Sequence, residues 1–78
     1  MNVHLYRLID NQMLYIQSNK WGWMGPYPVN RNTLKTEVDW AIATAKYMIG
    51  FYLRHGIDAK YVVGVENGTT VEYQEVKL

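Results

Sequence analysis

The sequence predicts a single small α+β domain over residues 1–78, with two β-hairpins flanking one long helix in the order ββαββ. Three observations predict it: alternating apolar residues around Asp10-Asn11, the same pattern around Asn67-Gly68, and an apolar stripe at helical spacing between residues 34 and 55. We expect two layers, with the helix packed across an antiparallel sheet. The chain of 78 residues has no cysteine and hence no disulfide, so its stability must come from aromatic packing, a partner or oligomerisation.

The first predicted hairpin is NVHLYRLIDNQMLYIQS, residues 2–18. Asp10 and Asn11 form its turn, because both side chains tolerate positive φ. The predicted pairs are Leu5 with Ile16, Arg7 with Leu14, and Ile9 with Gln12. The predicted core face carries Val3, Leu5, Ile9, Leu14 and Ile16. The opposite face carries His4, Tyr6, Leu8, Met13 and Tyr15, with Tyr6 opposite Tyr15, and so apolar a face needs a cover.

Residues 18–31 are expected to form an aromatic-anchored loop, because its glycines and prolines break strand pairing. Trp21 and Trp23 would point to the same side of an extended segment. We expect at least one of them to pack toward the helix. The loop tip, with Lys20, Met24 and Tyr27, would then be presented to a partner.

The helix is predicted from Leu34 to His55, with Asn32 or Thr33 as its N-cap and Gly56 as its left-handed stop. The stripe expected to face the sheet is Leu34, Val38, Ala41, Ala45, Met48, Ile49 and Tyr52, with Ile42 and Leu53 on its flank. A second ridge consists of Trp40, Tyr47 and Phe51. Two interpretations stay open: the loop covers this ridge, or the ridge is an interface for a partner or a homodimer.

The second hairpin is predicted in KYVVGVENGTTVEYQEVKL, residues 60–78, with Asn67-Gly68 as its two-residue turn. The predicted pairs are Glu66 with Thr69, Gly64 with Val71, Val62 with Tyr73, and Lys60 with Glu75. Val62, Val71 and Tyr73 share one face and Val63 and Val65 the other, and either face could be inward. Gly64 would leave room on the first face, for example for the helix.

The residues that carry chemistry do not form a familiar catalytic set. Ser18 is the only serine, and His4 and His55 lie at unrelated places, so we expect no nucleophile and base pair. Two histidines without cysteine do not predict a transition-metal site. We therefore expect no enzyme, no catalytic residues, no metal and no cofactor.

Charge and aromatic content point to binding. The net charge of +1 gives no strong field toward nucleic acid or membrane, and no apolar run approaches the roughly 20 residues of a membrane span. We expect a soluble cytoplasmic protein that binds another protein, with a homodimer as one such assembly. The predicted partner-binding residues are Tyr6, Tyr15, Lys20, Trp21, Trp23, Met24 and Tyr27. Nucleic acid is the alternative, because aromatic rings beside basic residues can stack bases; the basic residues concerned are Arg7, Lys20, Arg31 and Lys35.

Residues 41–78, AIATAKYMIGFYLRHGIDAKYVVGVENGTTVEYQEVKL, resemble the second half of small phage-encoded anti-CRISPR proteins of type I-F systems. The resemblance lies in a helix with an Ala-Lys-x-Met element (Ala45, Lys46, Met48) that runs to Gly56, followed by a Tyr-Val strand and a closing hairpin. It implies a small phage or mobile-element inhibitor that occludes a bacterial defence complex in the host cytoplasm.

The segment NTLKTEVDWAIATAKYMIGFYLRHG, residues 32–56, is similar to the Thr-Leu-initiated helix of HicB-like antitoxin domains, which follows a β-meander. Here WGWMGPYP stands where that family has a Pro-Asp-Leu-Pro-Gly-type segment. This similarity implies an antitoxin-like or nucleic-acid-binding module as the alternative function. An enzyme is third.

Overall fold

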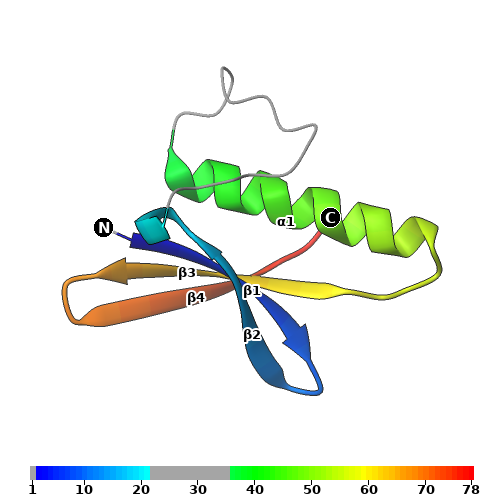
Figure 1. The fold of residues 1–78 in the computed structure, drawn as a ribbon, viewed down its shortest axis with the longest axis horizontal. Helices are drawn as coiled ribbons and strands as arrows, with labels where there is room; N and C mark the ends of the chain where they lie inside the picture. The colour runs from blue at the N-terminus through cyan, green and yellow to red at the C-terminus, as the bar shows by residue number, and fades with distance from the viewer. Residues whose placement is uncertain (1, 22–35) are drawn as a thin grey trace.

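The computed structural model describes residues 2–21 and 36–78 of the chain. The elements are β1 (Asn2–Ile9), β2 (Gln12–Ser18), a 3₁₀ helix η1 (Asn19–Trp21), α1 (Glu37–Arg54), β3 (Lys60–Asn67) and β4 (Thr70–Val76). The strands form one antiparallel sheet in the order β2-β1-β3-β4, and α1 lies across one face of it (Figure 1). The predicted two-layer ββαββ fold is confirmed.

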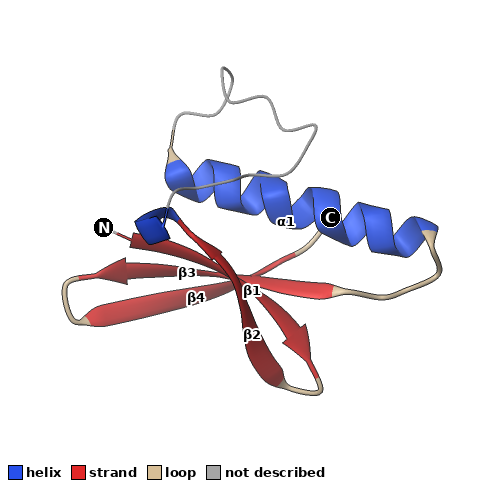
Figure 2. Cartoon of the chain, viewed as in Figure 1, coloured by secondary structure: helices blue, strands red, loops and turns tan. Residues whose placement is uncertain are grey.

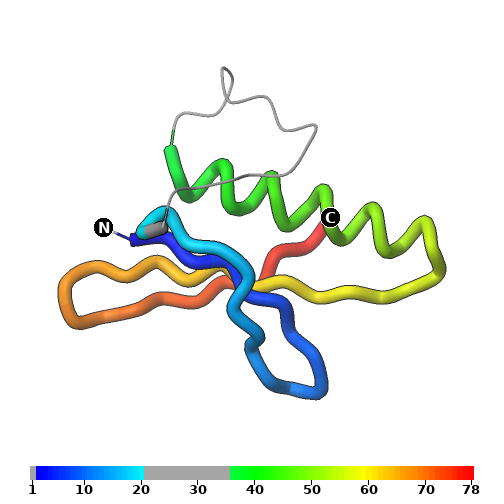
Figure 3. The backbone as a smooth tube through the Cα atoms, viewed as in Figure 1, coloured from blue at the N-terminus to red at the C-terminus, as the bar shows by residue number. Residues whose placement is uncertain are grey.

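The pairing of β1 with β3 in the middle of the sheet joins the two hairpins, which come from the two ends of the chain, into one sheet. Because these two strands run antiparallel, the turns of the two hairpins lie at opposite ends of the sheet (Figure 2). The backbone trace shows how strongly the hairpins twist relative to one another, as right-handed strand twist requires (Figure 3).

The first hairpin turns at Asp10 and Asn11, whose φ values are 51° and 64°, as predicted. The predicted pairs Arg7 with Leu14 and Ile9 with Gln12 are confirmed. The pair Leu5 with Ile16 is wrong, because the register shifts between Leu5 and Tyr6 and Leu5 lies opposite Gln17. Ile16 is thus the extra residue of a β-bulge.

The core lies between α1 and the sheet. Its buried residues are Val3, Leu5, Ala41, Ala45, Ala59, Tyr61, Val63 and Val76. The predicted helix stripe is confirmed over its described part, since Val38, Met48, Ile49 and Tyr52 pack against this core. The predicted core residues Ile9, Leu14 and Ile16 are instead exposed, because α1 packs chiefly on β3, β1 and β4 and leaves the end of the first hairpin uncovered.

The helix begins later than predicted. Thr36 has extended backbone, and its hydroxyl accepts a hydrogen bond of 3.0 Å from the Asp39 amide, so it is the N-cap. The predicted caps Asn32 and Thr33 and the predicted start at Leu34 lie outside the described residues. At the other end His55 is the C-cap and Gly56 has a φ of 75°, which confirms the predicted left-handed stop.

The turn of the second hairpin is one residue later than predicted. Asn67 is the last residue of β3 and pairs with Thr70, so Gly68 and Thr69 form the turn, and Gly68 takes the positive φ of 66°. The register therefore moves by two residues, and Tyr73 lies opposite Gly64 instead of Val62. An even shift leaves each residue on its predicted face. Val63 and Val65 pack toward α1, which resolves the orientation that the sequence left open.

Candidate functional site

The candidate site is the surface of the sheet that points away from α1, which we call the outer face. Strand alternation and register place these side chains on it: His4, Tyr6, Leu8, Met13, Tyr15, Lys60, Val62, Glu66, Val71, Tyr73 and Glu75. The predicted outer face of the first hairpin is thus confirmed, and β3 and β4 extend it. Among the described elements, the helix packs on the opposite side of the sheet (Figure 1).

Three tyrosines form the centre of the outer face. The Tyr6 ring lies between the other two, with centroid distances of 5.2 Å to Tyr15 and 6.0 Å to Tyr73. Both contacts are edge-on, with interplanar angles of 79° and 60°, which is a favoured geometry for aromatic pairs. Gly64 leaves room for these rings, since a Cβ atom at this position would contact the Tyr6 and Tyr73 rings.

The side chains of the outer face partly cover one another. Val62 points away from α1 but is buried, and it lies between Tyr6 and Glu75 on the neighbouring strands. His4 is also buried. The tyrosine rings remain partly open to solvent, so the face is a small second apolar layer with an aromatic surface.

A hydrogen-bonded chain joins the aromatic rings to an acid. His4 Nε2 lies 3.1 Å from Oε1 of Glu66, and its Nδ1 bonds the Tyr15 hydroxyl. Asn2 Nδ2 donates to the same Glu66 oxygen at 3.4 Å. Because a carboxylate can only accept, Nε2 of His4 carries a proton and donates it to Glu66. Both ring nitrogens of His4 are thus engaged in holding Tyr15 and Glu66 in place.

The surroundings of Glu66 and Tyr6 shift the pKa values of both groups. The hydrogen bond from His4, and then that from Asn2, lowers the pKa of the Glu66 carboxyl below its ordinary value, with a smaller effect from the positive charge of Lys20. Burial, followed by the neighbouring Tyr73, Tyr15 and Glu66, raises the pKa of Tyr6. At neutral pH the outer face therefore presents an uncharged Tyr6 beside a charged Glu66.

The predicted basic surface around the tyrosines does not include Arg7. The Arg7 guanidinium lies on the helix side of the sheet, 4.4 Å from the centre of the Tyr52 ring, and not beside Tyr6 and Tyr15. The reason is strand alternation, because adjacent residues on β1 point to opposite faces. Lys20 is exposed in η1. Arg31 and Lys35 lie outside the described residues.

The structure brings two of the seven predicted binding residues together, Tyr6 and Tyr15. Lys20 is exposed, and Trp21 is the last residue of η1, but the position of its side chain is not among the described features. Trp23, Met24 and Tyr27 lie outside the described residues, and so does the predicted packing of the loop. Sequence reasoning missed Tyr73, Glu66 and the role of Gly64, because the pairing of β1 with β3 leaves no local signal.

The second aromatic ridge of the helix is not a single surface. Trp40 is 6% exposed, whereas Phe51 is 39% exposed and contacts the rings of Tyr52 and His55. Tyr47 is intermediate. Trp40 therefore belongs to the interior, and Phe51 is the part of the ridge that a partner could touch.

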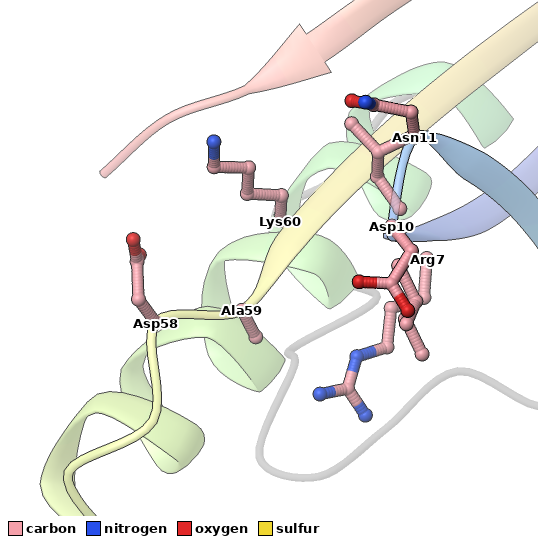
Figure 4. Close-up of a pocket in the computed structure, with 8 residues that line it drawn as sticks. Arg7, Asp10, Asn11, Asp58, Ala59 and Lys60 are labelled. Carbon is pink, nitrogen blue, oxygen red and sulfur yellow. The ribbon is translucent and has the colours of Figure 1, made fainter.

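A polar hollow of about 300 Å³ lies between the end of β1 and the start of β3. Its charged side chains are Arg7, Asp10, Asp58 and Lys60, shown in Figure 4 with Asn11 and Ala59. Two cations and two acids balance one another, so the hollow has no net charge with which to select an ion. Within residues 2–21 and 36–78, no group of three histidine, cysteine or acidic side chains could hold a metal.

Comparisons with models of protein families, with curated proteins and with solved structures find no match for this chain. No helix in the described part of the chain is long and apolar enough to cross a membrane.

Proposed function

We propose that this chain is a non-enzymatic binding protein that holds a protein partner against the outer face of its sheet. The observation that carries the proposal is the tyrosine cluster of Tyr6, Tyr15 and Tyr73 on the side opposite the helix, in which Tyr15 and Tyr73 are exposed. Tyrosine is enriched among the residues that dominate protein interfaces. Rings already held by mutual contacts and by His4 lose little conformational freedom on binding, which favours affinity.

The charges of this face favour a protein over a nucleic acid. On the outer face Glu66 and Glu75 outnumber Lys60 and would repel phosphates, while Arg7 lies on the other side of the sheet. Aromatic rings on an open antiparallel sheet can stack bases, so the nucleic-acid or antitoxin-like function is the alternative. The two differ in salt dependence, because phosphate contacts weaken steeply as salt rises and apolar contacts do not.

The specific role that we propose is that of a phage or mobile-element inhibitor that occludes a bacterial defence complex. Its support is the resemblance of residues 41–78 to type I-F anti-CRISPR proteins. A rigid aromatic surface on a small domain suits such a role, because occlusion needs tight binding and no chemistry.

The experiment is phage plating on a strain immune through a type I-F CRISPR system. Expression of the wild-type chain should restore plaques, and Tyr73→Ala should abolish the effect because it removes an exposed ring of the cluster. Phe51→Ala is the matched control, an exposed aromatic ring on α1, and should inhibit as the wild type does. Loss of inhibition by Phe51→Ala alone would place the contact on the helix ridge.

Absence of inhibition by the wild type would refute the defence-complex role. Binding to single-stranded nucleic acid that weakens steeply with salt and is lost in Tyr73→Ala would support the alternative instead.

A further inference from the structure

The strand β4 is an open edge of the sheet. It pairs with β3 on one side, and no described strand pairs with its other side (Figure 1). Residues 70–75 are all exposed, and only Val76 at the end of the strand is buried. An edge strand with an accessible backbone can accept a further strand from another chain.

The register shows which residues of β4 would bond to an added strand. Asn67 and Thr70 flank the two-residue turn, so they form the first hydrogen-bonded pair, and bonded and non-bonded pairs alternate from there. Val71, Tyr73 and Glu75 consequently occupy the positions that are not bonded to β3. Their amide and carbonyl groups point away from the sheet, toward the place of an added strand.

The same three residues place their side chains on the outer face. Tyr73 is 54% exposed and Val71 is 38% exposed, and the Tyr73 ring contacts the ring of Tyr6. A strand bonded to β4 would set alternate side chains beside Val71, Tyr73 and Glu75. Backbone bonding at the edge and contact with the tyrosine cluster would therefore occur together.

The charges of β4 indicate which kind of strand fits. β4 has two acidic residues and no basic one. Glu75 lies on the outer face and Glu72 on the face of α1, so an added strand meets one carboxylate on each face. Lys60 is diagonal to Glu75 in the register, but in the part of the chain that the structure describes neither carboxylate forms an ion pair. These acids oppose an acidic strand and favour a basic one.

We infer that a basic, extended segment of the protein partner adds to β4 as a fifth, antiparallel strand, with lysine or arginine opposite Glu72 and Glu75 and an apolar residue opposite Tyr73. Antiparallel pairing lets each outward-facing residue exchange both of its backbone hydrogen bonds with one residue of the partner. A second copy of this chain fits less well, because its own β4 would bring two more carboxylates to the same edge. The inference rests on the proposed function and names the chemistry of the partner.

A designed peptide tests this pairing on the full chain. In acetyl-Lys-Thr-Val-Lys-Val-amide, paired antiparallel, the two lysines lie opposite Glu75 and Glu72, and the first valine lies opposite Tyr73. Titration of the isotope-labelled chain should shift the backbone amide resonances of Val71, Tyr73 and Glu75 most and slow their exchange with solvent. The matched control peptide has glutamate in place of both lysines and should bind about tenfold more weakly.

Variants of the chain test the backbone bonding and the charge separately. Val71→Pro removes an outward-pointing N–H, which an edge strand tolerates, and should abolish peptide binding with unchanged circular dichroism. Its matched control, Val71→Thr, keeps the N–H and should bind as the wild type does. The double variant Glu72→Gln, Glu75→Gln should bind the basic peptide about fivefold more weakly. Asp39→Asn, which removes an exposed acid from α1, should bind it normally.

Four outcomes would overturn the inference. They are no binding at millimolar peptide, largest shifts away from β4, equal binding of the basic and acidic peptides, and a folded Val71→Pro that binds as the wild type does. If Val71→Pro fails to fold, the map of shifted amides and the double glutamine variant still decide.

The phage assay separates strand addition from the proposed function. Loss of inhibition in both Tyr73→Ala and folded Val71→Pro would support strand addition. Loss in Tyr73→Ala with full inhibition by Val71→Pro would overturn strand addition, while binding at the outer face would stand. A wild type that binds the basic peptide at β4 but does not inhibit the defence would support strand addition and refute the defence-complex role.

Discussion

Gly64 on β3 lies opposite Tyr73 on β4, and a Cβ atom at position 64 would come within 3.2 Å of the Tyr73 ring and 3.1 Å of Cε2 of Tyr6. Contacts this short require the neighbouring rings to shift by a few tenths of an ångström. The absence of a side chain at Gly64 thus gives the Tyr6 and Tyr73 rings room over the middle of the sheet.

We predict that Gly64→Val destabilises the fold by about 1–3 kcal/mol, the usual cost of overpacking. Denaturant unfolding measures this cost. In the background of Tyr73→Ala, which vacates the space, the cost of Gly64→Val should shrink, and the double-mutant cycle gives the coupling between the two sites. Equal costs in both backgrounds would show that the ring contact does not limit this position.

The His4–Glu66 hydrogen bond predicts a dependence of stability on pH. Because the pKa of Glu66 is lowered in the folded state, its carboxylate stabilises the fold above its ordinary pKa, and that stabilisation is lost as the pH falls through the lowered value. Glu66→Gln should therefore flatten the loss of unfolding free energy below about pH 4.5, the ordinary value for this group. Unfolding at a series of acidic pH values measures the difference. Glu72→Gln, which removes an acid from β4, should keep the wild-type profile.

Two aromatic residues of the same helix should respond differently to truncation. Trp40 is buried, so Trp40→Ala should cost about 3–5 kcal/mol, which is close to the whole stability of a small core. Phe51 is exposed, so Phe51→Ala should cost about 0.5 kcal/mol. Thermal melting distinguishes them. Similar melting of both variants would contradict the assignment of Trp40 to the interior.

The second turn should be sensitive at Gly68 and tolerant at Asn67. Gly68 has a φ of 66° with no atom within 4 Å of its missing Cβ, so the cost of Gly68→Val, about 1–2 kcal/mol, is backbone strain and not a clash. Asn67 is a strand residue paired with Thr70, so Asn67→Ala should cost less. Unfolding free energies of the two variants compare them, and a larger cost at Asn67 would support the turn at Asn67-Gly68.

Local patterns in the sequence determined the order of the elements. The turn at Asp10-Asn11, the stop at Gly56 and the helix stripe were all predictable, because turn chemistry and side-chain periodicity act over a few neighbouring residues. Which side chains share a face of each strand was predictable for the same reason. In the second hairpin this assignment held although the turn was predicted one residue too early, because an even shift of register preserves the faces.

The tertiary structure decided which faces are buried and which residues meet. The pairing of β1 with β3 joins segments about sixty residues apart, and no local signal fixes such a contact. That pairing places Glu66 beside His4 and Gly64 beneath Tyr6, and so assembles the outer face. The bulge at Ile16 and the burial of Trp40 were equally hidden, because each depends on packing around the residue and not on the pattern to which it belongs.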